Sequence, residues 1–308
     1  MEVMERISLA AIPMDAREAT AMVLRAHPEL HQLKKPVAYT GCSPSYALVL
    51  RMAWATGTTA GTSYYEALTR EENETARRRH EVERGRLVQR HLEVLEADVG
   101  HASGRWRLDS FDVDGGNPES SGHLFRARQL CAYWATRVVE GGWRDDTPRV
   151  TLMLGSRQTG CGKTHLAVAV ARDIVERTGC SARFARLADY LRAARDADRW
   201  SSAGDQRSVA GAVDLDEYRR CGVLVLDEMS LAGTPGYLLD RVVDLVDERI
   251  RWERPTVITG QFGSDDELAL PRGDDAQALD AARRLRSRLS TGVCCIMHPT
   301  LRDRRSAA

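Results

Sequence analysis

A short glycine-rich segment with the residue types of a phosphate-binding loop occurs at Gly160-Cys161-Gly162-Lys163-Thr164. Backbone N–H groups of such a loop hold phosphate oxygens, while Lys163 can reach the β- and γ-phosphates and Thr164 can ligate Mg²⁺. Only three of the 44 lysine and arginine residues are lysines, so a lysine here is informative, because an ammonium suits this loop better than a guanidinium. The segment therefore predicts a site for ATP and Mg²⁺.

The loop departs from the usual GxxxxGK[ST] pattern at its first glycine, where this chain has Arg157. The sequence leaves two explanations open. Either the loop is two residues longer and Gly155 makes the turn, or Arg157 adopts a backbone conformation that costs about 1–2 kcal/mol without glycine.

Two adjacent carboxylates, Asp227 and Glu228, follow an apolar segment that ends at Leu226. Residues just beyond the carboxyl ends of parallel strands face a shared crevice, so Asp227 is expected to hold Mg²⁺ and Glu228 to activate the water that attacks the γ-phosphate. The alternative is that the two acids only cap a helix. Gln261, just past another apolar segment, is a candidate for positioning the same water, unless it is simply a loop residue.

The C-terminal stretch from 283 to 305 is rich in arginine. A solvated basic face is the simpler interpretation in a chain with 41 arginines. Arg288, near the end of a predicted helix, and Arg302, after the last predicted strand, nevertheless stand where a guanidinium could reach a phosphate, in the same subunit or in a neighbour.

Five short strand-like segments alternate with helical segments after residue 148, which predicts an α/β fold with a parallel five-stranded sheet and flanking helices. The expected strands are 149–154, 181–187, 223–226, 255–259 and 293–297. The expected helices are 164–177, 188–198, one that begins after Pro235, and 276–289.

The N-terminal third is predicted to be helical, with helices from Asp15 to Pro28 and from Ser43 to Ala55, a loop over 57–63, and a long helix from Ser63 to Asp98. The middle of the long helix is almost entirely charged, so it is either a solvated helix or a module that binds a partner. The glycines from 100 to 104 indicate a linker. We therefore expect a helical partner-binding domain over 1–104 and an ATPase domain over 105–308.

The composition, 43% hydrophobic and 29% charged with a net charge of zero, excludes a disordered chain and a global polycation. The seven cysteines lack zinc-finger spacing, and their odd number favours reduced thiols. Neither a basic signal peptide nor an apolar run of ~20 residues is found, which predicts a cytoplasmic protein with no membrane partner.

These motifs, in this order, resemble the AAA+ ATPases of the bacterial replicative helicase loader family, of the DnaC and DnaI type, and the related IstB helper ATPase of transposons. The resemblance covers about residues 105–305. Its pieces are WRLDSFDVDGGNPESS, GCGKTHLAVAVA, VLVLDE, ERPTVITGQ and RLRSRLSTG followed by PTLR.

The resemblance implies roles for the motif residues. Gly160, Cys161, Gly162, Lys163, Thr164 and His165 belong to the nucleotide-binding Walker A segment, and Asp227 and Glu228 form Walker B. Gln261 takes the place of the sensor 1 asparagine, Arg288 that of the arginine finger and Arg302 that of sensor 2.

The resemblance also implies partners. Loaders assemble side by side through their ATPase domains, bind single-stranded DNA, and would hold a DnaB-type helicase with the N-terminal domain. The alternatives are an IstB-type helper of transposition, which acts on duplex DNA with a transposase, and a clamp or scaffold that binds ATP but hardly hydrolyses it, as Arg157 and Gln261 suggest.

Overall fold

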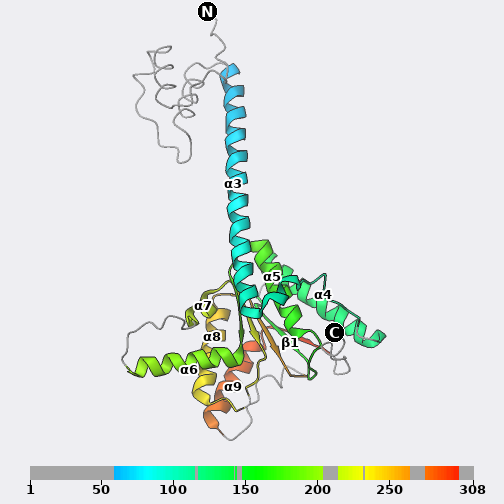
Figure 1. The fold of residues 1–308 in the computed structure, drawn as a ribbon, viewed down its shortest axis with the longest axis vertical. Coiled ribbons are helices and arrows are strands. Elements are labelled where there is room, and N and C mark those ends of the chain that lie inside the picture. The colour runs from blue at the N-terminus through cyan, green and yellow to red at the C-terminus, as the bar shows by residue number, and fades with distance from the viewer. Residues whose placement is uncertain are drawn as a thin grey trace, which may run out of the picture. The chain divides into compact units, whose positions relative to one another are not determined.

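The protein has an α/β fold in which helices flank a sheet of five parallel strands (Figure 1). The strands lie in the order β2-β3-β4-β1-β5. A computed structural model describes residues 59–114, 117–141, 143, 148–203, 214–231, 233–263 and 275–297. The strands are β1 (Thr151–Gly155), β2 (Ala182–Arg186), β3 (Val223–Asp227), β4 (Thr256–Gly260) and β5 (Val293–Ile296). The helices are α3 (Thr59–Val99), the 3₁₀ turn η3 (His101–Arg105), α4 (Pro118–Glu140), α5 (Lys163–Thr178), α6 (Leu187–Ala203), α7 (Leu215–Arg220), α8 (Gly236–Arg251) and α9 (Ala276–Leu289).

Helices cover both faces of the sheet, which explains why its three central strands are buried along their whole length and do not alternate between buried and exposed residues. All residues of β1, β3 and β4 are buried. One apolar cluster joins the sheet to α6, α8 and α9, and a second joins it to α4, α5 and the end of α3. The order of strands, with β4 between β1 and β3, brings the carboxyl ends of these three strands together.

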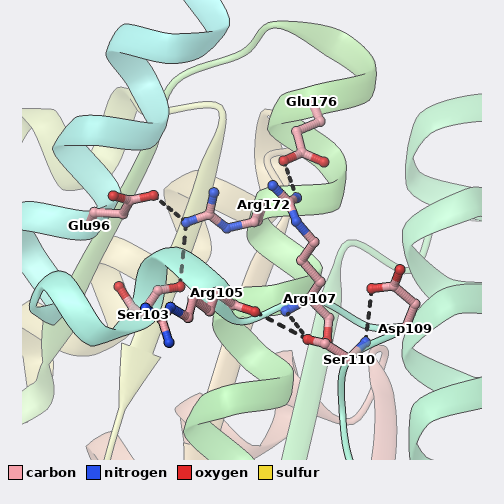
Figure 2. A network of polar contacts seen from close by, with 8 residues as sticks. All are labelled: Glu96, Ser103, Arg105, Arg107, Asp109, Ser110, Arg172 and Glu176. Atoms are coloured by element: carbon pink, nitrogen blue, oxygen red, sulfur yellow. Dashed lines mark hydrogen bonds and ion pairs between the residues drawn. The ribbon is translucent and has the colours of Figure 1, made fainter.

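The C-terminal part of α3 packs on the ATPase fold. Arg172, buried in α5, donates to Glu96 at 2.5 Å and to the carbonyl of Ser103 at 3.4 Å (Figure 2). Asp98 accepts the backbone N–H of Phe184 at 3.1 Å and is paired with Arg183, so it satisfies backbone donors at the open edge of β2. The expected linker at 100–104 is instead a 3₁₀ turn held against α5.

The division of the chain follows from these contacts. Two compact units are distinguished, Met1–Glu83 and Arg84–Ala308, so the last sixteen residues of α3 belong to the unit that carries the sheet. The domain boundary expected at residue 104 stays a prediction. Within the described residues, no helix is long and apolar enough to span a membrane.

Arg249 in α8 fixes one end of the sheet from a fully buried position. Its guanidinium donates to the hydroxyl of Thr256 at 2.8 Å and to the carbonyls of Tyr218, Cys221 and Pro255 at 2.8, 3.0 and 2.7 Å. Burial lowers the pKa of Arg249, and the carbonyl acceptors compensate for the desolvated charge. The contacts tie α8 to the starts of β3 and β4.

Most sequence-predicted elements after residue 148 are confirmed, with shifts of a few residues at their ends; α6 runs five residues further than expected. The helices α4 and α7 were not expected, although Asn117 caps α4 through Ser120 and Pro118 follows at its first turn, a recognisable start signal. The long helix begins at Thr59, inside the expected loop and before the expected cap at Ser63. The two helices predicted before residue 56 lie outside the described residues.

Candidate active site

The phosphate-binding loop joins the end of β1 to the start of α5. Gly160 and Gly162 have φ angles of 70° and 96°, a left-handed conformation that favours glycine. A Cβ on Gly162 would lie 2.6 Å from the ring of Phe111, a buried residue in the segment before α4. Gly162 is therefore fixed by its backbone angle and by the close approach of an aromatic ring.

Neither explanation offered for Arg157 holds. Among the described non-glycine residues, only Glu228 and Glu253 have positive φ angles, so Arg157 needs no glycine-like conformation. Gly155 does not turn the chain, because it is the last residue of β1 and pairs with Gly260 of β4. Gly155 instead makes room for a neighbour, since a Cβ there would lie 2.3 Å from the ring of Phe262.

Lys163 lies across the loop in this structure. Its ammonium donates to the carbonyl oxygen of Gln158 at 2.8 Å. The backbone N–H of Gln158 in turn donates to the hydroxyl of Ser156 at 3.2 Å. The ammonium is thus held inside the loop, where it can exchange a carbonyl for a phosphate oxygen.

Asp227, at the end of β3, is the buried centre of the site, with 4% of its surface exposed. Its Oδ1 accepts hydrogen bonds from the hydroxyl of Thr164 at 2.9 Å and from that of Thr259 at 2.5 Å. Thr164 and Thr259, which are 63 and 32 positions from Asp227 in the sequence, therefore meet at one carboxylate oxygen. Carboxylate and hydroxyl oxygens are the ligands that Mg²⁺ prefers, so Thr164 and Asp227 fit a magnesium site.

Glu228 leaves β3 in a strained conformation, with φ at 56°. Its backbone N–H donates to the hydroxyl of Thr259 at 3.1 Å, and the N–H of Met229 donates to the carbonyl of Thr259 at 2.7 Å. Strained residues held in this way gather at functional sites. The turn exposes the Glu228 side chain beside the buried Asp227, as water activation would require.

Gln261 follows β4, and its side chain is exposed. The next residue, Phe262, is 1% exposed, and its ring lies against both Gly155 and Gly260. This packing anchors the loop that carries Gln261 to the strand that carries the phosphate loop.

Three aromatic rings meet at the first turn of α5. His165 stacks on Trp106, with centroids 5.2 Å apart, and meets the edge of Phe111 at 5.1 Å. The segment carrying both rings is fixed to α5 by an ion pair between Arg107 and Glu176, and the hydroxyl of Ser110 accepts the N–H of Arg107 at 3.1 Å (Figure 2). The role of His165 in nucleotide binding stays a prediction, because its ring faces these two aromatics.

A pocket of about 390 Å³ opens beside Thr164 and Asp227. Its walls combine aromatic and acidic side chains, including those of Trp106, Tyr218 and Asp189. It therefore extends the candidate magnesium site toward the edge strand β2.

Arg288, the candidate arginine finger, lies apart from this cluster. Arg288 is exposed near the end of α9 and is paired with Asp247 of α8. Its helix leads into β5, whose first residue Val293 pairs with Leu152 near the start of β1. At about 3.3 Å per residue, the start and end of β1 are ~13 Å apart, so the fold does not bring Arg288 to its own phosphate loop. Arg302 lies outside the described residues.

The geometry agrees with a comparison of sequence families. Residues 142–270 match the model of the "IstB-like ATP binding protein" family. The matched residues contain the phosphate loop, both carboxylates and Gln261. Together with the parallel sheet, they are those of a P-loop ATPase of the AAA+ type. The resemblance noted from the motifs is thus confirmed.

Solved structures and curated proteins were also compared. The structure of the DnaC helicase loader is 19% identical and has a TM-score of 0.44, with 65% of this chain and 100% of that chain covered. The structure of DnaI is 21% identical with a TM-score of 0.45, covering 66% and 94%. AMPPCP-bound DnaA from Aquifex aeolicus is 16% identical with a TM-score of 0.43, covering 63% and 50%. No curated protein matches the chain significantly in sequence.

Sequence reasoning missed the residues that support the motifs. Thr259 was treated only as part of a strand, and Phe262 was not considered. A threonine in an apolar strand next to a predicted catalytic strand is a usable signal, because a buried hydroxyl needs a partner.

Thr259→Val keeps the shape of the side chain but removes the hydroxyl that orients Asp227 and Glu228. We expect ATP turnover to fall about 10–100-fold, as for other residues that support metal ligands. The free energy of unfolding should fall by about 1–3 kcal/mol, because the Asp227 carboxylate and the Glu228 N–H each lose a partner. Steady-state hydrolysis and denaturant unfolding measure the two effects.

Thr151→Val is the matched control, since Thr151 is a buried threonine at the start of β1, the end of that strand away from the phosphate loop. Its turnover should stay within about twofold of the unmodified chain. Equal losses of turnover in both variants would show that Thr259 acts only through general stability.

Proposed function

We propose that the chain hydrolyses ATP with Mg²⁺ in order to load a replicative helicase onto single-stranded DNA. The main support for ATP hydrolysis is that one oxygen of Asp227 accepts hydrogen bonds from both Thr164 and Thr259. These bonds join the phosphate loop, β3 and β4 in one polar centre. The exposed Glu228 stands next to this centre.

The residues divide the work in the following way. Backbone N–H groups of 160–164 and the Lys163 ammonium hold the phosphates, and Thr164 with Asp227 holds Mg²⁺. Bound there, Mg²⁺ would neutralise charge on the β- and γ-phosphates. Glu228 accepts a proton from the attacking water, and the amide of Gln261 orients that water.

Two variants test the ATPase assignment. Glu228→Gln keeps size and hydrogen bonding but removes the base, so ATP should bind normally while turnover falls by about 10²-fold or more. Lys163→Ala removes the cation of the phosphate loop and should abolish ATP binding. Binding of a fluorescent ATP analogue and phosphate release distinguish the two effects.

Unchanged ATP affinity in Lys163→Ala would contradict the phosphate-site assignment. Turnover within a few-fold of normal in Glu228→Gln would contradict the role of Glu228 alone. If the unmodified chain binds ATP and releases no phosphate, the nucleotide-dependent clamp becomes the better account.

Self-association is proposed because Arg288 cannot serve its own site. The exposed guanidinium lies at the far end of the sheet from its own phosphate loop, so it would act on the ATP of a neighbouring subunit. Arg288 would then stabilise the charge that spreads over the phosphoryl group during transfer.

Mixing two inactive variants tests this arrangement. Arg288→Ala should bind ATP but lose ~10³–10⁵ in rate, as expected of an arginine finger. Mixed with Glu228→Gln protein, it should recover activity, since an intact Glu228 site can then lie beside an intact Arg288. Light scattering establishes co-assembly, and zero activity at every ratio of co-assembled protein would refute the role in trans.

The partner proposals are a DnaB-type helicase for the region 1–104, single-stranded DNA for the assembled ATPase domains, and a cytoplasmic location. They rest on the motif resemblance that covers the ATPase region, and the exposed, largely charged surface of α3 over residues 76–87 is compatible with a partner. A role as transposition helper is the second candidate, and the match of 142–270 to the IstB-like family favours it.

A loading assay separates the two roles. The full chain, with ATP, should promote unwinding by the replicative helicase of the same genome on circular single-stranded DNA coated with single-strand-binding protein. Lys163→Ala should not. Binding to a transposase and to duplex DNA, without any effect on the helicase, would overturn the loader in favour of the transposition helper.

A further inference from the structure

Arg157 is the residue at which the phosphate loop departs from its usual pattern, and its side chain has a specific neighbour. It follows β1 by two positions and is exposed, and its backbone is unstrained. The absence of glycine at 157 therefore costs the loop nothing in backbone energy, and the question is what the added side chain contacts.

The side chain of Arg157 lies directly on Gly263, three residues past the end of β4. A Cβ built on Gly263 would lie 2.8 Å from Nε of Arg157 and 3.3 Å from both Cδ and Cζ. All three nearest atoms belong to Arg157. A side chain at 263 would therefore displace the guanidinium end of Arg157 from the backbone of this loop.

Gly263 belongs to the same short loop as Gln261. Between them, Phe262 packs on Gly155, while the N–H of Ser156 donates to the carbonyl of Gly260 at 3.3 Å. The start of the phosphate loop therefore contacts the Gln261 loop on both sides of Gln261. Phe262 supplies a buried apolar contact with Gly155. Arg157 supplies a second contact, with Gly263.

The part of the phosphate loop next to Arg157 is also held by Lys163. The ammonium donates to the carbonyl of Gln158, the residue after Arg157. If Lys163 exchanged this carbonyl for a phosphate oxygen, the backbone at 157–158 would lose that restraint. A change at the phosphates would then reach the segment that carries Arg157.

We propose that Arg157 is a positioning residue which couples the phosphate loop to the Gln261 loop through Gly263. The coupling makes the placement of Gln261, and with it ATP hydrolysis and the preference for ATP over ADP, depend on this contact. The inference rests on the proposed ATPase function.

A double-mutant cycle tests the contact. Arg157→Ala removes the side chain, and Gly263→Ala fills the space that the side chain occupies. Each should lower kcat about tenfold, with KM for ATP changed less than threefold, and each should reduce the ratio of ATP to ADP affinity. Because both break one contact, Arg157→Ala/Gly263→Ala should be no slower than either single variant, which is the non-additivity expected of coupled residues.

Three further variants separate coupling from other effects. Arg157→Lys keeps the charge but not the planar guanidinium, so it should resemble Arg157→Ala. Arg251→Ala removes an exposed arginine at the end of α8, and Gly85→Ala adds a Cβ where nothing lies within 4 Å. These two controls should retain the kcat and the affinity ratio of the unmodified chain.

The outcomes are distinguishable. Additive losses in the double variant, or normal kcat and normal ATP preference in Arg157→Ala, overturn the coupling while the unmodified chain remains an ATPase. An unmodified chain that binds no ATP overturns the proposed function itself. If Gly263→Ala fails to fold in thermal unfolding, Arg157→Ala and Arg157→Lys still decide the proposal through kcat and the affinity ratio.

Discussion

A buried carboxylate at the end of β3 is the constraint on which the site depends. Asp227 has lost most of its contact with water, and a buried carboxylate needs strong hydrogen bonds. Thr164 and Thr259 provide them from two different elements. These bonds align the start of α5, the end of β3 and the end of β4 around one carboxylate.

Glycines on neighbouring strands let this centre close. Gly155 and Gly260 are paired across β1 and β4, and the ring of Phe262 occupies the space that two side chains would fill. On the other face, Phe111 approaches Gly162 in the same way. Two aromatic rings thus pack at the two ends of the phosphate loop, and each fits only because the glycine beside it has no Cβ. Interiors packed this closely transmit small shifts.

The order of strands and helices after residue 148 and the residue types of the site could be predicted from the sequence. Short, largely apolar segments between amphipathic segments are sufficient to predict buried parallel strands, because both faces of such a sheet are covered. The residue types at Gly162, Lys163 and Thr164, together with those at Asp227 and Glu228, are sufficient to predict phosphate and Mg²⁺ binding without a structure. The helix α4 also had a readable start at Asn117-Pro118, although it was not predicted.

Which side chains support that chemistry, and what the side chain of Arg157 contacts, could be learned only from the three-dimensional structure. Thr259, Phe262 and Gly263 have no motif of their own, and their roles arise because β4 lies between β1 and β3. The sequence allowed two explanations for Arg157, and both were wrong, since the answer depends on a contact with a residue 106 positions away. Local patterns record backbone preference and burial, whereas the pairing of distant side chains is fixed only when the sheet brings the strand ends together.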